Sequence, residues 1–318
     1  MQKNKAPFLR THQTTASIMQ TVLIALIPVV VMAVVHFGPR VLLMLAVSTI
    51  SAVLFEYGHQ KWAKKETTIH DFSAAVTGVL VGLSYPVTAP FWILVLGSFI
   101  AIVVIKQWAG GIGKNHFNPA VFSRILIKIL FTPWMTNWVA PTWDAVSVAT
   151  PLEFIGNGQN ILAEGLPSLY DLFIGNIGGG IGETTKWAIL LGFAFLVYKK
   201  VIHWEAPVGT MLGLFLMGML FGGSDIEYAL YHVLSGTALF AAVFMVTDYS
   251  SSPMGRRAHF YFAVAIGITT GLLRYAFDFP GGVGIAILLM NVMTPLFNAW
   301  FAPRAFGEKG RRVTFETR

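Results

Sequence analysis

Long apolar runs are the feature that most limits what this chain can fold into. Residues 18–35 contain no Asp, Glu, Lys or Arg, and a run of about 18 or more apolar residues indicates a membrane span. Hydrophobic residues make up 55% of the 318 residues and charged residues 12%, whereas an ordinary globular domain carries about 25% charged residues. A soluble chain would need far more surface charge, so the sequence predicts an integral membrane protein.

The runs predict an all-α polytopic membrane fold with about ten transmembrane helices. We expect the spans at residues 18–36, 41–57, 73–88, 90–105, 117–131, 187–199, 207–222, 229–247, 259–275 and 282–301. Several of them are short, and short or interrupted segments in a membrane bundle often line a site. The polar, basic residues before the first run show no cleavable signal peptide pattern, so this run is expected to be retained.

Basic residues are distributed unevenly between the predicted loops. With the N-terminus inside, the cytoplasmic segments hold 17 of the 22 Lys and Arg residues, and the external segments hold only Arg40 and Lys186. This is the positive-inside bias that sets orientation. It predicts cytoplasmic N- and C-termini and an external loop at 132–186. It also argues that the net charge of +7 reflects membrane topology and not nucleic acid binding.

Two pairs of similar segments suggest an internal repeat. The segment 70–74, which starts with His70, resembles the segment that starts with His232, and the glycines from Gly110 resemble those from Gly281. An odd number of spans in each half would make the halves inverted in the membrane, as in urea-channel-like folds. We therefore expect a first five-helix repeat at 1–131, an external loop at 132–186, and a second five-helix repeat with a cytoplasmic tail at 187–318.

The long external loop contains the motif that carries chemistry. Asp144, Ser147, Ala149 and Thr150 form the pattern Asp-x-x-Ser-x-Ala-Thr, which resembles the acceptor site for covalent flavin transfer. In that reaction a flavin transferase links the phosphate of FMN to the threonine hydroxyl as a phosphoester. The alternative is a capping box or Asx-turn that opens a short helix at Ser147 or Thr150.

Further segments extend the resemblance over nearly the whole chain. They are 110–120, 232–237, Thr247 with Asp248, Leu273 with Arg274, and 280–283. Together they resemble the RnfD/NqrB family. This family holds the D subunit of the Rnf ion-translocating ferredoxin:NAD oxidoreductase and the B subunit of the sodium-translocating NADH:quinone reductase. The first span starts by about residue 18, and the quinone-reductase subunit usually has a longer N-terminal region, which favours the Rnf subunit.

The resemblance implies a function, cofactors and partners. It implies a flavoprotein subunit that relays electrons through FMN on Thr150, in a complex that couples ferredoxin:NAD electron transfer to Na⁺ or H⁺ translocation. A noncovalent riboflavin is a second expectation. The implied partners are the other Rnf subunits (A, B, C, E and G), a flavin transferase and the lipid bilayer of a prokaryotic plasma (inner) membrane. The chain has no cysteine, so iron–sulfur centres ligated by thiolates must lie in other subunits.

Four further residues are candidate flavin neighbours: Asn118, Arg124, Ser235 and Arg274. Arg124 and Arg274 lie in or near predicted spans, where charged side chains usually face a cavity or a partner. The alternative for both is snorkelling to the membrane interface. Two other functions also stay open, a flavin-free urea-channel-like transporter and a structural membrane scaffold, but the scaffold leaves the Thr150 loop unexplained.

Overall fold

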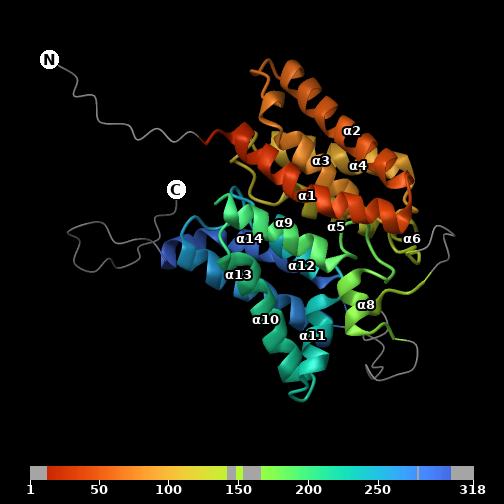
Figure 1. Ribbon diagram of the computed structural model, residues 1–318. Coiled ribbons are helices and arrows are strands. Elements are labelled where there is room, and N and C mark those ends of the chain that lie inside the picture. Colours follow the sequence, from red (N-terminus) through yellow and green to blue (C-terminus); the bar gives the residue numbers. More distant parts are fainter. Residues whose placement is uncertain (1–12, 142–147, 153–165, 278, 302–318) are drawn as a thin grey trace, which may run out of the picture.

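The computed structural model describes residues 13–141, 148–152, 166–277 and 279–301, and these form a bundle of helices (Figure 1). Each predicted span contains a helix or a broken pair of helices. In the first half these are α1 (Thr15–Phe37), α2 (Arg40–Trp62), α3 (Ser73–Leu83), α4 (Phe91–Phe99) continued by the π-helix η2 (Ile100–Gln107), and α5 (Pro119–Leu130). In the second half they are α9 (Lys186–Tyr198), α10 (Glu205–Phe221), α11 (Ile226–Leu234) with α12 (Ala238–Phe244), α13 (Arg256–Tyr275) and α14 (Gly282–Trp300).

The lengths of these helices confirm a polytopic membrane protein. Within the described residues, α1, α2 and α14 are each long and apolar enough to cross a membrane, and α11 with α12 passes the same test as a pair bent by 58°. Outward-facing apolar side chains such as Leu43, Leu54 and Val292 are about 60% exposed, as expected where lipid replaces water. The ten-span count and the two-repeat organisation stay predictions.

Equal spacing between helix starts supports the predicted repeat. Arg40 and Glu205 start α2 and α10, Ser73 and Ala238 start α3 and α12, and Phe91 and Arg256 start α4 and α13. The members of each pair are 165 residues apart. The starts of three helices are therefore separated by the same chain distances in both halves, although α11 lies between α10 and α12 in the second half.

Two of the predicted spans are not continuous α-helices. After Phe99 the hydrogen bonding of α4 changes to the π pattern of η2, and such π segments are frequent at functional sites. The predicted span 229–247 breaks at Ser235, which is extended, and at Gly236, whose φ of +65° is left-handed. Apolar content alone does not reveal this break, because the residues on both sides of it are apolar.

In its described residues the predicted external loop includes the short helices α6 (Thr132–Met135) and α8 (Leu169–Ile174). The start of α8 is fixed by a capping box, in which Ser168 and Asp171 each bind the other's backbone N–H. Between α8 and α9 the chain folds onto the end of α3, where Gly182 N–H donates to the Leu83 carbonyl at 2.7 Å. The loop is thus packed onto the bundle through this segment.

Candidate functional site

The segment 148–152, which contains Thr150, packs into the bundle between two glycines. Val148 N–H donates to the Trp138 carbonyl at 3.0 Å. A Cβ on Gly178 would lie 2.5 Å from Val148 Cγ2, and a Cβ on Gly236 would lie 2.5 Å from Leu152 Cδ1. A side chain at either position would displace Val148 or Leu152, so the segment packs closely against glycine at both of its ends.

Thr150 itself is 9% exposed and directly precedes the helical residues Pro151 and Leu152. This is the position of a helix-capping residue, with proline at the first helical position. This placement agrees with the alternative that Thr150 caps a helix. For Thr150 to be the flavin acceptor, the segment must expose the threonine hydroxyl during the transfer reaction. Asp144 and Ser147 of the motif lie outside the described residues.

Beside this segment lies an ion pair, with a buried Glu183 and a partly buried Arg124, that joins α5 to the residues before α9. Arg124 Nη2 lies 3.4 Å from Glu183 Oε2, and Arg124 Nη1 donates to Thr237 Oγ1 at 2.9 Å. The Thr237 hydroxyl donates in turn to Glu183, and Gly180 N–H donates to Glu183 Oε1 at 2.9 Å. The Glu183 carboxylate thus accepts hydrogen bonds from Arg124, Thr237 and Gly180, and its negative charge balances the positive charge of Arg124.

Two other cations meet at the break between α11 and α12. Lys186 is fully buried, and its Nζ donates to the Gly236 carbonyl at 3.1 Å and to the Glu183 carbonyl. Arg274 is 5% exposed, and its guanidinium donates to the His232 carbonyl at 2.6 Å and the Ser235 carbonyl at 3.4 Å. These contacts satisfy carbonyl groups that the broken helix leaves without intrahelical partners.

Several buried polar atoms at the same break have no hydrogen-bond partner among the described residues. They are both ring nitrogens of His232, the Ser235 hydroxyl, Arg274 Nε and the Tyr275 hydroxyl. The His232 ring packs against aromatic rings on two sides, with centroid distances of 4.7 Å to Tyr228 and 4.5 Å to Tyr275. Such orphaned groups are rare in folded proteins and require an explanation.

The structure therefore brings together three of the four candidate flavin neighbours, Arg124, Ser235 and Arg274, beside the Thr150 segment. The fourth, Asn118, lies elsewhere. It caps α5 by accepting from Ala120 N–H and Val121 N–H, and it donates to the Met245 carbonyl at 3.0 Å. Its own N–H donates to Asn291 on α14 at 3.1 Å. Asn118 thus ties α5 to the second half of the chain.

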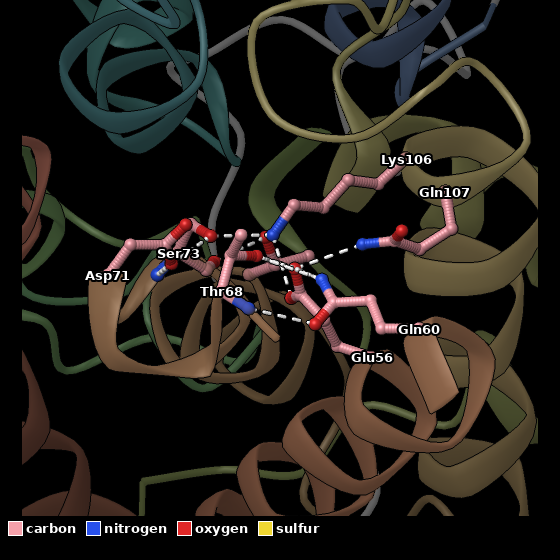
Figure 2. A network of polar contacts seen from close by, with 8 residues as sticks. Glu56, Gln60, Thr68, Asp71, Ser73, Lys106 and Gln107 are labelled. Carbon is pink, nitrogen blue, oxygen red and sulfur yellow. Dashed lines mark hydrogen bonds and ion pairs between the residues drawn. The ribbon is translucent and has the colours of Figure 1, made fainter. Parts of the chain in front are cut away.

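A second buried polar network lies between α2, the start of α3 and the end of η2 (Figure 2). Its centre is an ion pair of 2.8 Å between Lys106 Nζ and Glu56 Oε2, both almost completely buried. Lys106 also donates to Ser73 Oγ at 2.6 Å. The other donors to Glu56 are Gln60, Thr68 and Gln107, at 3.1, 3.4 and 2.9 Å.

A cavity adjoins this network, with about 100 Å³ available to the centre of a water molecule. Its polar lining includes Ser73, Lys106, Asn115 and Asp248, and a space of about 10–15 Å³ by this measure already holds one water. Asp248 accepts hydrogen bonds from Ser251 at 2.8 Å and from Ser250. Burial raises the pKa of the Asp248 carboxyl, and these hydrogen bonds partly oppose the rise.

The two polar regions lie at opposite ends of α1. The cavity is lined by Ile18 and Met19 near the start of this helix. Near the other end of α1, the His36 ring packs close to Gly175 and Thr185. Thr185 directly precedes Lys186 in the chain. The helix rises by about 27 Å between Ile18 and His36, at about 1.5 Å per residue.

Sequence analysis did not identify the Glu56–Lys106 pair. The available signal was that two opposite charges lie at the ends of the predicted spans 41–57 and 90–105. Lys186 was also assigned to an external loop, but it is the fully buried first residue of α9.

Comparison with known proteins places these features in a family context. The family model described as NQR2, RnfD, RnfE family matches residues 2–307. The chain is 38% identical to the D subunit of the Na(+)-translocating ferredoxin:NAD(+) oxidoreductase complex of Acetobacterium woodii, over 96% of this chain and 94% of the relative. It is 35% identical to the D subunit of the proton-translocating ferredoxin:NAD(+) oxidoreductase complex of Clostridium ljungdahlii, over 96% of both chains. It is 34% identical to the D subunit of the ion-translocating oxidoreductase complex of Cellvibrio japonicus, over 98% of this chain and 97% of the relative.

Proposed function

This chain belongs to the NQR2, RnfD, RnfE family, and on that premise we propose that it is the D subunit of an ion-translocating ferredoxin:NAD oxidoreductase complex. The carrying observation is similarity over almost the full length of three proteins that bear the name of this subunit in such complexes. As a subunit it acts within the oxidoreductase and has no independent catalytic activity. Its partners are the other subunits of the complex, which the sequence resemblance names as A, B, C, E and G.

We further propose that Thr150 carries FMN through a phosphoester. The support is the acceptor pattern in the sequence and the buried cations beside the segment 148–152. A bound flavin would supply reversible electron transfer. The residues of this chain would fix its position through Thr150 and surround it with the charges of Arg124, Lys186 and Arg274. The transferase that attaches FMN must reach the hydroxyl of a residue that is 9% exposed here, so attachment precedes the packing of this segment or requires its opening.

The position of Thr150 constrains how the protein works in the complex. In the proposed topology both termini are cytoplasmic and Thr150 is external, in a prokaryotic plasma membrane. A hydrocarbon core of about 30 Å is too wide for one flavin to bridge alone. Carriers in partner subunits, such as a second FMN on the G subunit, must therefore bring electrons across from the cytoplasmic redox substrates. A noncovalent riboflavin in this chain would be one further carrier.

The coupling ion is not indicated by the similarity. One relative of 38% identity bears the name of a Na⁺-translocating complex and one of 35% identity that of a proton-translocating complex. Within the described residues, no group of three or more His, Asp or Glu is placed to hold a metal ion. We propose that ion movement follows from a change in the bundle between two states with different affinities for the ion.

In-gel flavin fluorescence tests the attachment site. The chain is produced with a flavin transferase and separated under denaturing conditions, where only covalent flavin stays with the protein. We expect fluorescence for the wild type and for Thr237→Val, and none for Thr150→Val. Thr237 is the matched control, because it is a buried threonine that follows glycine within the same site. Fluorescence that persists in Thr150→Val, or that is missing from the wild type, would exclude Thr150 as the acceptor.

The alternative assignments make different predictions. A B subunit of a Na⁺-translocating NADH:quinone reductase would also carry flavin, and it is distinguished by its partners in the purified complex. A flavin-free urea-channel-like transporter is favoured by the predicted inverted repeat and by the cavity at the start of α1, and it predicts no covalent flavin on any residue.

A further inference from the structure

The break between α11 and α12 holds more positive than negative charge. Arg124 is paired with Glu183. Within the described part of the chain, neither Lys186 nor Arg274 forms an ion pair with a carboxylate, and both direct their donors at backbone carbonyls. Isolated buried cations are strongly unfavourable, so proteins normally pair them. Among the described residues one carboxylate, Glu183, faces the three cations Arg124, Lys186 and Arg274, so the site keeps an excess of positive charge that suits a further anion.

The site also contains hydrogen-bonding groups that have no partner among the described residues. Among the described residues, Arg274 Nε is buried and unpartnered, as is the Ser235 hydroxyl that stands beside the carbonyl bound by Arg274. An oxyanion is the partner that suits a guanidinium, because the fork of N–H groups matches its oxygens. The unpartnered Arg274 Nε and the excess of positive charge thus point to the same class of ligand.

The Thr150 segment is the part of the chain that approaches this site. A point at the Cβ position of Gly236 lies 2.5 Å from Leu152 Cδ1 and 3.7 Å from Arg274 Nη2. Leu152 is two residues from Thr150, and two residues of extended chain span at most about 7 Å. A group attached to the Thr150 hydroxyl can therefore reach the cations with a small movement of the segment.

We propose that Lys186 and Arg274 bind the phosphate that joins the flavin to Thr150, and so lock the segment 148–152 onto the helix break. This inference rests on the proposed flavinylation of Thr150 and adds residues to it that the acceptor pattern does not contain. The phosphodiester carries one negative charge, which offsets part of the charge of the two cations. Lys186 and Arg274 are positioning residues, since they hold the attached group and do not react.

A double-mutant cycle measures this coupling. Four chains are produced with the transferase: wild type, Thr150→Val, Lys186→Gln, and the double variant. Their thermal unfolding midpoints are compared in the same detergent. We expect flavin attachment to stabilise chains that keep Lys186 by on the order of 2 °C or more, and to have a much smaller effect in chains that carry Lys186→Gln. Additive midpoint changes, the result for sites that do not interact, would overturn the inference.

Matched variants separate a structural role from phosphate binding. Lys128→Gln, on α5 and packed over the Phe279 ring, removes a cation outside the site and should leave the effect of flavin unchanged. Arg274→Lys keeps the charge but loses the fork, so it should keep part of the effect. This variant also carries the test if Lys186→Gln does not fold. Equal loss of coupling in Lys128→Gln would contradict a specific site.

Two outcomes distinguish the inference from the function on which it rests. If no chain carries the mass of FMN, the proposed attachment fails, and with it the reason for the phosphate. If the wild type carries FMN but Lys186 couples to Glu153 instead, as shown by a cycle with Glu153→Gln, the counter-charge is a carboxylate. The flavin assignment then stands and the phosphate site is wrong.

Discussion

Glu56 on α2 and Lys106 at the end of η2 form an ion pair of 2.8 Å, with side chains that are 1% and 4% exposed. Removing one partner of such a pair leaves an uncompensated buried charge, which costs about 3–5 kcal/mol. We therefore expect Glu56→Gln to lower the free energy of unfolding by an amount in this range, measured by denaturant titration in detergent.

The chain provides a control for this prediction. Glu205 pairs with Arg256 at the same distance of 2.8 Å, but that arginine is 61% exposed. Exposed pairs contribute about 0–1 kcal/mol, so Glu205→Gln should have little effect. The double variant Glu56→Leu with Lys106→Met should recover most of the loss. Equal losses in Glu56→Gln and Glu205→Gln would show that the buried pair is not special.

Gly236 and Gly223 permit a paired test of the packing of the Thr150 segment. Their φ angles are +65° and +64°, but a Cβ meets Leu152 at Gly236 and nothing within 4 Å at Gly223. Alanine at either position costs roughly 1–2 kcal/mol for the left-handed backbone. Only Gly236→Ala should also displace the segment, which proteolysis near Thr150 would detect. Equal protease sensitivity in the two variants would contradict the close packing.

A substitution of Asn118 distinguishes a role in stability from a role in flavin binding. Asn118→Ala removes the cap of α5 and the contacts with Met245 and Asn291, so we expect a loss of about 1–2 kcal/mol or more in stability. The fraction of chains with covalent flavin, measured by absorbance against protein, should not change. A selective loss of flavin without loss of stability would make Asn118 a flavin neighbour after all.

The carboxyl of Asp248 lies between α12 and α13, and burial raises its pKa. The folded chain thus binds this proton more tightly than the unfolded chain, and the free energy of unfolding falls as the pH rises from the ordinary aspartate pKa toward the raised value. Asp248→Asn should remove this fall and be at least as stable as the wild type at neutral pH. Thermal midpoints across this range measure it, and an unchanged pH profile in the variant would contradict the assignment.

Sequence analysis predicted the features that depend on local composition. Apolar runs placed a helix in every predicted span, whereas the helix α8 within the predicted external loop was not predicted. The break at Gly236 was not predicted, because it depends on carbonyl contacts with Lys186 and Arg274, which are distant in the chain. Tertiary contacts of this kind leave no local pattern.

The candidate site was predicted in part for the same reason. Family resemblance singled out Ser235 and Arg274, and charge within a predicted span singled out Arg124; the structure brings the three together beside the Thr150 segment. Lys186 and Glu183 were not recognised, since both were assigned to the predicted external loop, where they follow a glycine-rich stretch. The glycines of this stretch allow the close approach of Val148 and the hydrogen bond from Gly180 to Glu183. The assignment of flavin to Thr150 stays a prediction.

The mass of the peptide that contains Thr150 tests that central claim most directly. No Lys or Arg lies between Lys128 and Lys186, so cleavage after the aromatic residues Trp143 and Phe154 gives a more suitable fragment than trypsin. Chain purified from a host with the flavin transferase should yield this fragment with the added mass of phosphoester-linked FMN, located on Thr150 by fragmentation. An unmodified fragment, or FMN located on another residue, would contradict the account.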